Sequence, residues 1–350
     1  MGKTTIITAL LTAMLFVIPA AAILLPAAET FEDERRKVTA FPPLSAKMRN
    51  REIRKWFKDV DAFFADRFPL RSSFMALPRA LYEESYSDID MQACFRGKDN
   101  WLFLGNNYDR CIDKLQGAIT LSEASLEKQT AEFMSRSAKA KEWGADFYIL
   151  IGPNKSSVYP EFLPSFIKPA EQRFISPLVA SLLANKVRVF DPTEHLLQSK
   201  HKGLLYYITD THWNALGAYE AYCAFLANNS LPALPKLYFV DDGPRAGGDL
   251  IDIGGYRVYP LSTGDNFRIA GRSPVKTLTD THFVNPSADN DKTVWVFADS
   301  FGIKLKPFIA MGYRNAFFFE HDQFSEMDAS GQPRPDLVLW VHIERVFAQP

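Results

Sequence analysis

Continuous apolar runs that alternate with helical patterns are the feature that most constrains the fold of this chain. Residues 147–152, Phe-Tyr-Ile-Leu-Ile-Gly, form such a run, which is typical of a strand covered on both faces. A helix is expected before this run, over residues 121–143. Further strands are expected over residues 187–191, 294–298, 316–319 and 337–343, and further helices over residues 171–185, 214–228 and 303–311. Because the two patterns alternate, the sequence predicts an α/β fold with a mostly parallel sheet and helices on both faces.

Ser300 stands at the junction between a predicted strand and a predicted helix. The segment 294–302 reads Val-Trp-Val-Phe-Ala-Asp-Ser-Phe-Gly, and Pro307 is expected to kink or shorten the helix after it. A hydroxyl at this junction is exposed at the carboxyl edge of the sheet, where open α/β folds bind ligands and helix N-terminal amides stabilise negative charge. Ser300 is therefore a candidate nucleophile. The alternative is a helix N-cap, whose hydroxyl satisfies free amides and nothing more.

A serine nucleophile needs a base and a group that orients the base. The segment 206–214, Tyr-Tyr-Ile-Thr-Asp-Thr-His-Trp-Asn, supplies Asp210 and His212. In an extended segment, side chains two residues apart share a face, so Asp210 would fix the tautomer of His212. Thr-Asp-Thr-His recurs at residues 279–282. We favour the first copy because Trp213 and a helix follow it, whereas the second copy reads as an exposed loop between strands.

Asp-Thr-His-Trp at residues 210–213, the Asn-Ala-Leu-Gly-Ala-Tyr after it, and Ala-Asp-Ser-Phe at residues 298–301 together resemble a known family. The chain resembles the SGNH-hydrolase-like proteins of the alginate O-acetyltransferase AlgJ/AlgX family. Further segments that carry the resemblance are residues 66–71, 97–105, 153–161 and 335–345. The family usually has Gly-Asp-Ser where this chain has Ala298, and a missing glycine affects the geometry of the turn. The order Asp-His before Ser resembles the permuted arrangement of these acetyltransferases.

The resemblance implies an exported O-acetyltransferase that acetylates hydroxyls of a secreted polysaccharide, alginate-like or another exopolysaccharide. Asp210 would orient His212, His212 would take the proton of Ser300, and Ser300 would carry the acetyl group. The resemblance also implies a membrane-bound O-acyltransferase as acetyl donor and a polysaccharide export complex as partner. No cofactor is expected.

Two other functions fit the same residues. The first is a carbohydrate acetylesterase, in which water takes the acetyl group from the same triad. The second is a non-catalytic, polysaccharide-binding scaffold subunit of an export complex, and Ala298 is the feature most compatible with it.

Four more polar residues are candidates for contact with substrate. Lys155 and Tyr159 follow the strand over residues 147–152, at the edge of the sheet where Ser300 is expected. There they can bind a sugar or help hold an acyl oxygen. The alternative is a solvated loop lysine and a tyrosine that packs under it. Asn154 is a candidate oxyanion donor. Arg345 is either a substrate contact or part of a structural ion pair in the closing Glu-Arg sequence.

Residues 4–28 contain no charged side chain, follow Lys3, and are long enough to cross a bilayer as a helix. They are expected to tether the protein to the inner membrane with the rest in the periplasm; the alternative is a cleaved signal peptide ending near Ala22. The expected organisation is therefore a membrane segment over residues 1–30, a helical lead-in over residues 31–90 and an SGNH-like domain over residues 91–350. The aromatic residues of the lead-in are expected to pack as a helix.

Cysteine usage and charge limit the remaining possibilities. Cys94 and Cys111 flank a predicted strand and either form a disulfide across a hairpin or remain free thiols. Cys223 is expected to be a small core residue. The formal net charge of -1 gives no electrostatic case for nucleic-acid binding. The spacing of the histidines matches no familiar zinc pattern, so no metal site is expected.

Overall fold

The computed structural model describes residues 92–256, 259–271, 273–328 and 333–350, together with residues 30, 31, 36, 37, 43, 56, 59, 60 and 63. The predicted membrane segment over residues 4–28 lies outside the described residues, as does most of the predicted lead-in. None of the helices in the described part of the chain is both long and apolar enough to cross a membrane.

The chain divides into two compact units, Met1–Asp88 with Ile251–Val258, and Ile89–Leu250 with Tyr259–Pro350. In the first unit, β1 (Thr30–Phe31) pairs antiparallel with β2 (Arg36–Lys37). Trp56 and Phe63 are helical there, as the spacing of the aromatic residues predicts. The second unit holds the large sheet and the candidate site.

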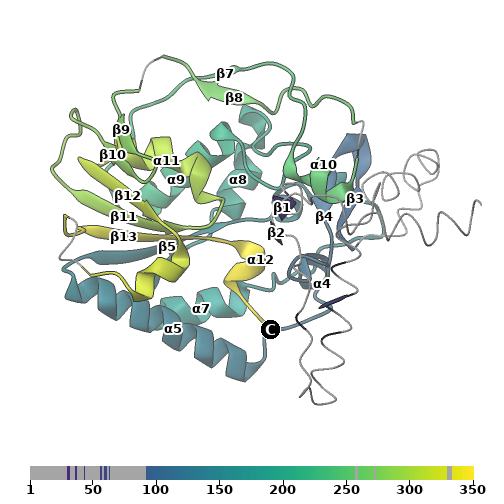
Figure 1. Cartoon of the computed structure of the whole chain (residues 1–350), viewed down its shortest axis with the longest axis horizontal. Helices are drawn as coiled ribbons and strands as arrows, with labels where there is room; N and C mark the ends of the chain where they lie inside the picture. The colour runs from purple at the N-terminus through teal and green to yellow at the C-terminus, as the bar shows by residue number, and fades with distance from the viewer. Residues whose placement is uncertain are drawn as a thin grey trace, which may run out of the picture. The chain divides into compact units, whose positions relative to one another are not determined.

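The second unit is built on a seven-stranded sheet in the order β6-β5-β13-β11-β12-β10-β9 (Figure 1). The strands are β5 (Asp146–Gly152), β6 (Arg188–Phe190), β9 (Lys276–Thr279), β10 (His282–Val284), β11 (Thr293–Ala298), β12 (Asn315–Phe319) and β13 (Leu337–Ile343). Neighbours from β6 to β12 are parallel, whereas β10 and β9 are antiparallel at one edge. The predicted mostly parallel sheet is confirmed. The second Thr-Asp-Thr-His copy spans the turn between β9 and β10, where we had expected a loop.

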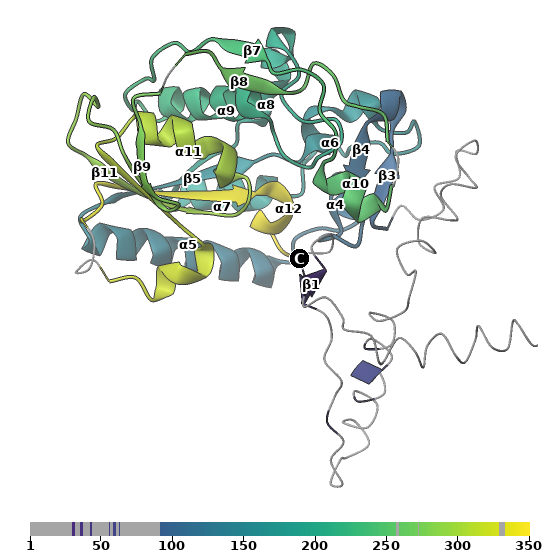
Figure 2. The same ribbon diagram turned by 45° about the horizontal axis from the view of Figure 1, so that its top comes forward.

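Helices cover both faces of this sheet, as predicted (Figures 1 and 2). On one side lie α8 (Thr193–Ser199), α9 (Ala215–Asn228) and α11 (Gly302–Met311); on the other lie α5 (Glu123–Glu142), α7 (Ser176–Ala184) and η4 (His321–Ser325). Along β11, Val294 and Val296 belong to the core that packs against α8, α9 and α11. Trp295 and Phe297 belong to the core on the other face, which packs against α5 and α7. This alternation follows from the two-residue repeat of a strand and explains why β11 is apolar throughout.

Two predicted helices differ in detail from the observed ones. Helix α7 begins at Ser176 and not at residue 171, and Pro177 occupies its first turn, a position that proline favours because it lacks an amide proton. Helix α11 continues through Pro307 to Met311, so the proline does not shorten it. The start of α5 agrees with the sequence, since the Ser122 hydroxyl accepts a hydrogen bond from the Ser125 amide at 3.2 Å.

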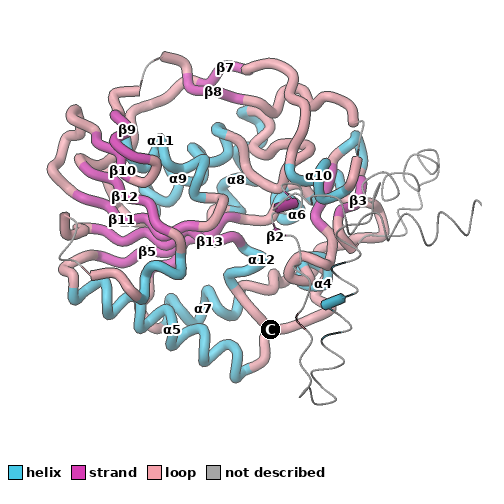
Figure 3. Tube along the Cα trace, in the orientation of Figure 1, coloured by secondary structure: helices cyan, strands magenta, loops and turns pink. Residues whose placement is uncertain are grey.

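The remaining elements of the second unit are short. They lie mainly beyond the carboxyl edge of the sheet or on the side of α8, α9 and α11 (Figure 3). They are β3 (Cys94–Arg96), η1 (Lys98–Asn100), β4 (Leu102–Leu104), α4 (Cys111–Leu115), α6 (Lys155–Val158), η2 (Pro160–Phe162), η3 (Lys200–Lys202), β7 (Phe239–Asp241), β8 (Phe267–Ile269) and α12 (Glu344–Phe347). Helix α10 (Asp249–Gly254) begins in this unit.

No disulfide joins Cys94 to Cys111, so the bridge considered from the sequence is not formed. The reason is the register of the hairpin, which places Cys94 opposite Leu104, while Cys111 lies beyond the hairpin at the start of α4. The Cys111 thiol instead donates to the carbonyl oxygens of Leu104 and Gly105, each at 3.1 Å. Burial raises the pKa of Cys111 to about 12.

Candidate active site

Ser300, His212 and Asp210 form a continuous hydrogen-bonded relay. His212 Nε2 lies 2.8 Å from Ser300 Oγ, and His212 Nδ1 lies 2.7 Å from Asp210 Oδ1. An ionised carboxylate only accepts hydrogen bonds, so Nδ1 is the donor, and the unprotonated Nε2 of the neutral imidazole accepts from the Ser300 hydroxyl. The relay therefore has the donor and acceptor order that a serine nucleophile requires.

The strand-to-helix junction places Ser300 as expected. β11 ends at Ala298 and α11 begins at Gly302, so Ser300 lies in the turn between them. Asp299 fixes this turn, because its carboxylate accepts hydrogen bonds from the amide of Phe301 at 3.0 Å and from the amide of Ile343 at 2.6 Å. Trp213 Nε1 also donates to the Phe301 carbonyl at 3.1 Å, which ties the histidine segment to the serine turn.

The histidine segment reaches this geometry by a turn and not by the extended conformation that the sequence suggested. Residues 208–212 are turns and bends, closed by a bridge between Tyr206 and Trp213. Asp210 Oδ1 accepts from both the backbone amide of His212, at 3.1 Å, and its Nδ1. A carboxylate that bonds the backbone two residues ahead is a common way for aspartate to stabilise a turn. The pairing of Asp210 with His212 was predicted, but for the wrong reason.

Arg245 and Asp249 complete the surroundings of Asp210. Asp210 Oδ2 accepts from Arg245 Nη2 at 3.0 Å and from the Asp249 amide at 3.3 Å. Burial alone would raise the pKa of the Asp210 carboxyl, but the hydrogen bonds from His212 and the charge of Arg245 outweigh it and hold this pKa well below its usual range. Asp210 is therefore ionised at any pH at which the imidazole can act as a base.

Arg245 and Asp249 were not predicted from the sequence as site residues. Both lie in a segment with no helical or strand periodicity. Gly248 is the one local indication: it has φ +135°, and a Cβ there would lie 2.1 Å from the Thr209 carbonyl oxygen. Glycine at this position lets the two loops approach closely.

Lys155 is neither a substrate contact nor a solvated loop residue. Its side chain is buried, and Nζ donates to the backbone carbonyls of Tyr207, Ile208 and Asp210 at 3.1, 2.9 and 2.8 Å. Burial lowers the pKa of Lys155 to about 8. Lys155 therefore holds the turn that carries Asp210.

Tyr159 is also structural. Its ring is buried and its hydroxyl accepts from the Leu205 amide at 2.8 Å, at the base of the same segment. Burial raises the pKa of Tyr159 to about 12. The direct substrate contact considered for this tyrosine is not supported.

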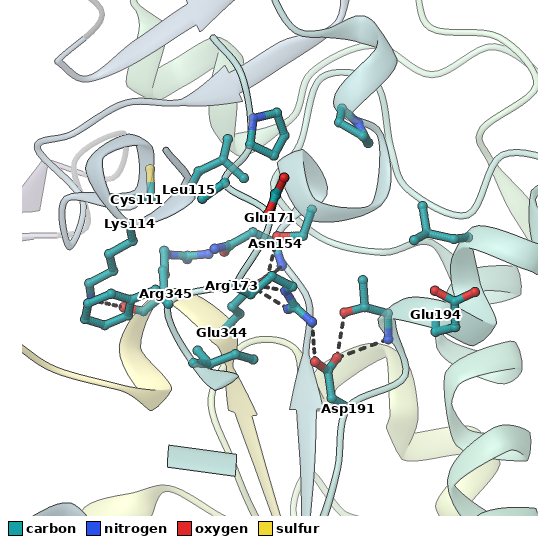
Figure 4. A pocket seen from close by; sticks show the side chains of 18 residues that line it. Cys111, Lys114, Leu115, Asn154, Glu171, Arg173, Asp191, Glu194, Glu344 and Arg345 are labelled. Carbon is teal, nitrogen blue, oxygen red and sulfur yellow. Dashed lines mark hydrogen bonds and ion pairs between the residues drawn. The ribbon is translucent and has the colours of Figure 1, made fainter. Parts of the chain in front are cut away.

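Asn154 and Arg345 line a cavity of about 350 Å³ at the carboxyl ends of β5, β6 and β13 (Figure 4). The side chains of the relay are not part of its lining. The backbone amide of Asn154 donates to Glu344 at 2.7 Å, and Arg345 Nε lies 4.0 Å from Asp109. A second, small cavity of about 20 Å³ also contains Asn154 and Arg345 and reaches Thr211, the neighbour of His212.

The ion pair at the wall of this cavity is not the one considered from the sequence. Glu344 pairs with Arg173 at 2.7 Å and not with its neighbour Arg345. Figure 4 shows Arg173 between Glu344 and Asp191, and it forms an ion pair with each. Arg173 therefore ties the end of β13 to the end of β6.

Asp210, His212 and Asp249 are the set of possible metal ligands in the described part of the chain, with ligand atoms within 4.8 Å of one another. Two contacts oppose a cation here. Nδ1 of His212 already donates to Asp210, and the guanidinium of Arg245 occupies the second oxygen of the same carboxylate. A bound cation would meet the positive charge of Arg245 at close range.

The second Asp-Thr-His copy takes no part in the relay. His282 lies in β10, between β12 and the edge strand β9, and its ring stacks on Phe317, with centroids 4.0 Å apart. The carbonyl of Asp280 accepts from Lys306 Nζ at 3.1 Å.

Comparisons with known proteins identify related chains. Residues 94–235 match the family model described as the SGNH hydrolase-like domain of the acetyltransferase AlgX. The probable alginate O-acetylase AlgJ of Pseudomonas syringae pv. tomato is 25% identical over 176 residues, which are 47% of this chain and 40% of that relative. The match therefore spans less than half the length of this curated relative.

Solved structures with a similar fold include PatB1 of Bacillus cereus with a sulfonyl adduct. It overlays with a TM-score of 0.57 at 16% identity, covering 75% of this chain and 98% of PatB1. The O-acetyltransferase domain of Pseudomonas putida AlgJ overlays with a TM-score of 0.47 at 19% identity, covering 73% and 92%. At this level of identity, the overlay with PatB1 shows a shared fold. The predicted SGNH-hydrolase-like α/β fold is confirmed.

Proposed function

Because residues 94–235 match the SGNH hydrolase-like domain of the acetyltransferase AlgX, we propose that the chain is a member of the AlgJ/AlgX family and an O-acetyltransferase that acts on a polysaccharide. The observation that carries the proposal is the relay, with 2.8 Å between Ser300 Oγ and His212 Nε2 and 2.7 Å between His212 Nδ1 and Asp210. A serine that serves only as a helix N-cap needs neither an imidazole at hydrogen-bond distance nor a carboxylate behind it.

The reaction proceeds in two transfers. Ser300 Oγ attacks the acetyl carbonyl while its proton passes to His212 Nε2, and the donor's leaving oxygen departs with that proton. The carboxylate of Asp210 stabilises the imidazolium in between. A sugar hydroxyl then attacks the acetyl-serine, gives its proton to Nε2, and leaves as the O-acetyl sugar while Ser300 recovers its hydroxyl.

The backbone amide of Ser300 is the proposed donor to the oxyanion. The amides of Phe301 and Gly302, which come next in the turn, already donate to Asp299 at 3.0 Å each. The usual glycine of the family motif is Ala298 here, and the relay atoms still lie at hydrogen-bond distance. An amide directed at the developing charge contributes strongly to acyl transfer because it is already oriented.

The biological setting follows from the relatives and is part of the proposal. A relative is called a probable alginate O-acetylase, which supports a secreted polysaccharide as acceptor. We propose a periplasmic location with residues 4–28 as the tether, a membrane-bound O-acyltransferase as acetyl donor, and work within a polysaccharide export complex.

Transfer and hydrolysis are separated by one assay on the purified protein. An activated acetyl ester is supplied with and without an oligosaccharide of the candidate polymer. The proposal predicts acetylated oligosaccharide and an ester consumption that rises with sugar concentration. Free acetate that is unaffected by sugar would instead identify an acetylesterase.

Replacement of Ser300 by Ala distinguishes catalysis from a scaffold role. The proposal predicts that Ser300→Ala abolishes acetylation while the thermal unfolding profile is retained. Ser273→Ala, which changes an exposed serine away from the relay, is the matched control and should be fully active. A polymer that is still acetylated normally by Ser300→Ala would point to a scaffold.

A further inference from the structure

A second carboxylate faces the same nitrogen of His212 that Asp210 binds. Asp249 Oδ2 lies 3.5 Å from His212 Nδ1, compared with 2.7 Å for Asp210 Oδ1. The side chains of His212, Asp210 and Asp249 are 14%, 13% and 12% exposed, so all three are largely shielded from water. A charge in such a place acts more strongly on the imidazole than a surface charge does.

Thr211 holds Asp249 in this position. Its backbone amide donates to Asp249 Oδ1 at 2.7 Å and its hydroxyl donates to Oδ2 at 2.5 Å. The same hydroxyl lies 3.3 Å from His212 Nδ1. The Asp249 amide in turn donates to Asp210. The position of Asp249 is therefore fixed from the same turn that carries the base.

The two carboxylates differ in how their charge is compensated. Asp210 is paired with Arg245 at 3.0 Å, and this guanidinium also stacks on Tyr207 at 4.2 Å from the ring centroid. For Asp249, within the described residues, the ion pair is with His212 alone. The charge of Asp210 is thus largely offset before the reaction begins, whereas that of Asp249 is available when the imidazole becomes positive.

We propose that Asp249 is a second positioning residue for His212, which shares with Asp210 the stabilisation of the imidazolium that forms when Nε2 takes the Ser300 proton. In this step the Oγ–H bond breaks and the Nε2–H bond forms, while Nδ1 keeps its proton. The inference rests on the proposed acyl-transfer function, and it assigns to the relay four side chains in place of three.

The test compares Asp249→Asn, Asp210→Asn and the double variant, with an activated acetyl ester as probe. Asp249→Asn keeps the shape and removes the charge, so we expect kcat to fall about tenfold with KM unchanged. Asp210→Asn alone should lose only about 10²-fold because Asp249 still faces the imidazole. The double variant should lose about 10⁴-fold, the loss seen when a triad has no carboxylate.

The pH profile separates a charge effect from a purely structural one. The charged groups around His212 are Asp210 and Asp249, Arg245 behind Asp210, and Lys155 beneath the turn. The turn before α11 contributes the apolar ring of Phe301, and Lys304 of α11 lies over Tyr207. Removal of an anion makes protonation of the imidazole less favourable. The acid limb of the plot of kcat against pH should therefore move to lower pH in Asp249→Asn. Asp249→Glu restores the charge and should return the limb toward its original position.

Controls make each outcome decisive. Asp242→Asn, at an exposed ion pair with Arg268, should leave both kcat and the pH profile unchanged. The inference is overturned if Asp249→Asn keeps kcat and the acid limb, or if the double variant is no worse than Asp210→Asn. If Asp249→Asn does not fold, Asp210→Asn decides: a loss of about 10²-fold supports a second carboxylate and a loss of about 10⁴-fold excludes it. Activity in Ser300→Ala would instead overturn the proposed function itself.

Discussion

At the scale of single residues, Lys155 shows what a sequence conceals about a site. Its place after β5 suggested a cation at the carboxyl edge of the sheet. Its three hydrogen bonds to the carbonyls of Tyr207, Ile208 and Asp210 were not predictable, because the direction of a backbone carbonyl in an irregular turn has no sequence pattern. The buried ammonium stabilises the turn, and the turn supplies the carboxylate of the relay.

Replacement of Lys155 by Met tests this role. Methionine keeps the volume but leaves three carbonyls without their donor, so we expect the free energy of unfolding to fall by about 3 kcal/mol. Displacement of Asp210 should lower kcat about 10²-fold. Urea unfolding and steady-state kinetics measure the two effects. Lys98→Met, which removes an exposed donor to the Glu161 carbonyl, should change neither. Normal activity in a folded Lys155→Met would contradict the assignment.

At the scale of elements, β11 and α11 were predictable because their local chemistry is unambiguous. A strand buried on both faces must be apolar throughout, and the Asp-Ser-Phe-Gly sequence marks its end. The hairpin of β9 and β10 was missed because β9 is exposed along its whole length and has no apolar face. The loop that carries Arg245 and Asp249 was missed because its contacts are between polar groups and backbone, which leave no periodic pattern.

The approach of α11 to β11 yields a compensation experiment. A Cβ on Gly302 would lie 2.3 Å from the Cβ of Ala298, so Gly302→Ala should destabilise the fold by about 2 kcal/mol and displace Ser300. Ala298→Gly removes the obstacle, and the double variant should recover most of the stability and activity. Thermal unfolding and ester turnover report both quantities.

Gly312 provides the control for this pair. It lies at the other end of α11, where an added Cβ has its nearest neighbour at 3.6 Å, so Gly312→Ala should be tolerated. If the double variant is as impaired as Gly302→Ala, the contact between Ala298 and Gly302 is not what the junction depends on.

At the scale of the second unit, the sheet separates two cores with different tasks. One core packs α8, α9 and α11 and supports the relay; the other packs α5 and α7 and contains His342 in a stack of aromatic rings. The arrangement of this sheet was largely predictable, since five apolar strands and the helices between them admit few topologies. The ionisable groups buried in the second core were not, because burial of a histidine depends on its neighbours in space.

His342 makes the stability of this core dependent on pH. Its Nδ1 accepts from Trp340 at 3.2 Å, and burial together with the charges of His321 and Arg136 lowers its pKa from 6.5 to about 3. The unfolded chain takes the proton near pH 6.5 and the folded chain resists it until about pH 3. The contribution of His342 to the free energy of unfolding is therefore complete above pH 6.5 and is lost as the pH falls toward 3.

His342→Phe keeps a ring in the stack and removes the titration. Between about pH 7 and about pH 4, the wild type should lose about 3 kcal/mol more stability than this variant, as measured by urea unfolding. His201→Phe, at an exposed histidine, should follow the wild type. Equal losses in His342→Phe and the wild type would show that His342 does not titrate in this way.

The central claim is that Ser300 carries the acetyl group, and mass spectrometry after rapid quenching tests it most directly. Wild-type protein is mixed with an activated acetyl ester without acceptor, quenched in acid and digested. The account predicts one added acetyl group on the peptide that contains Ser300, its loss when oligosaccharide is added before the quench, and none in Ser300→Ala or His212→Ala. Sugar acetylation that proceeds while Ser300 is never modified would contradict the account.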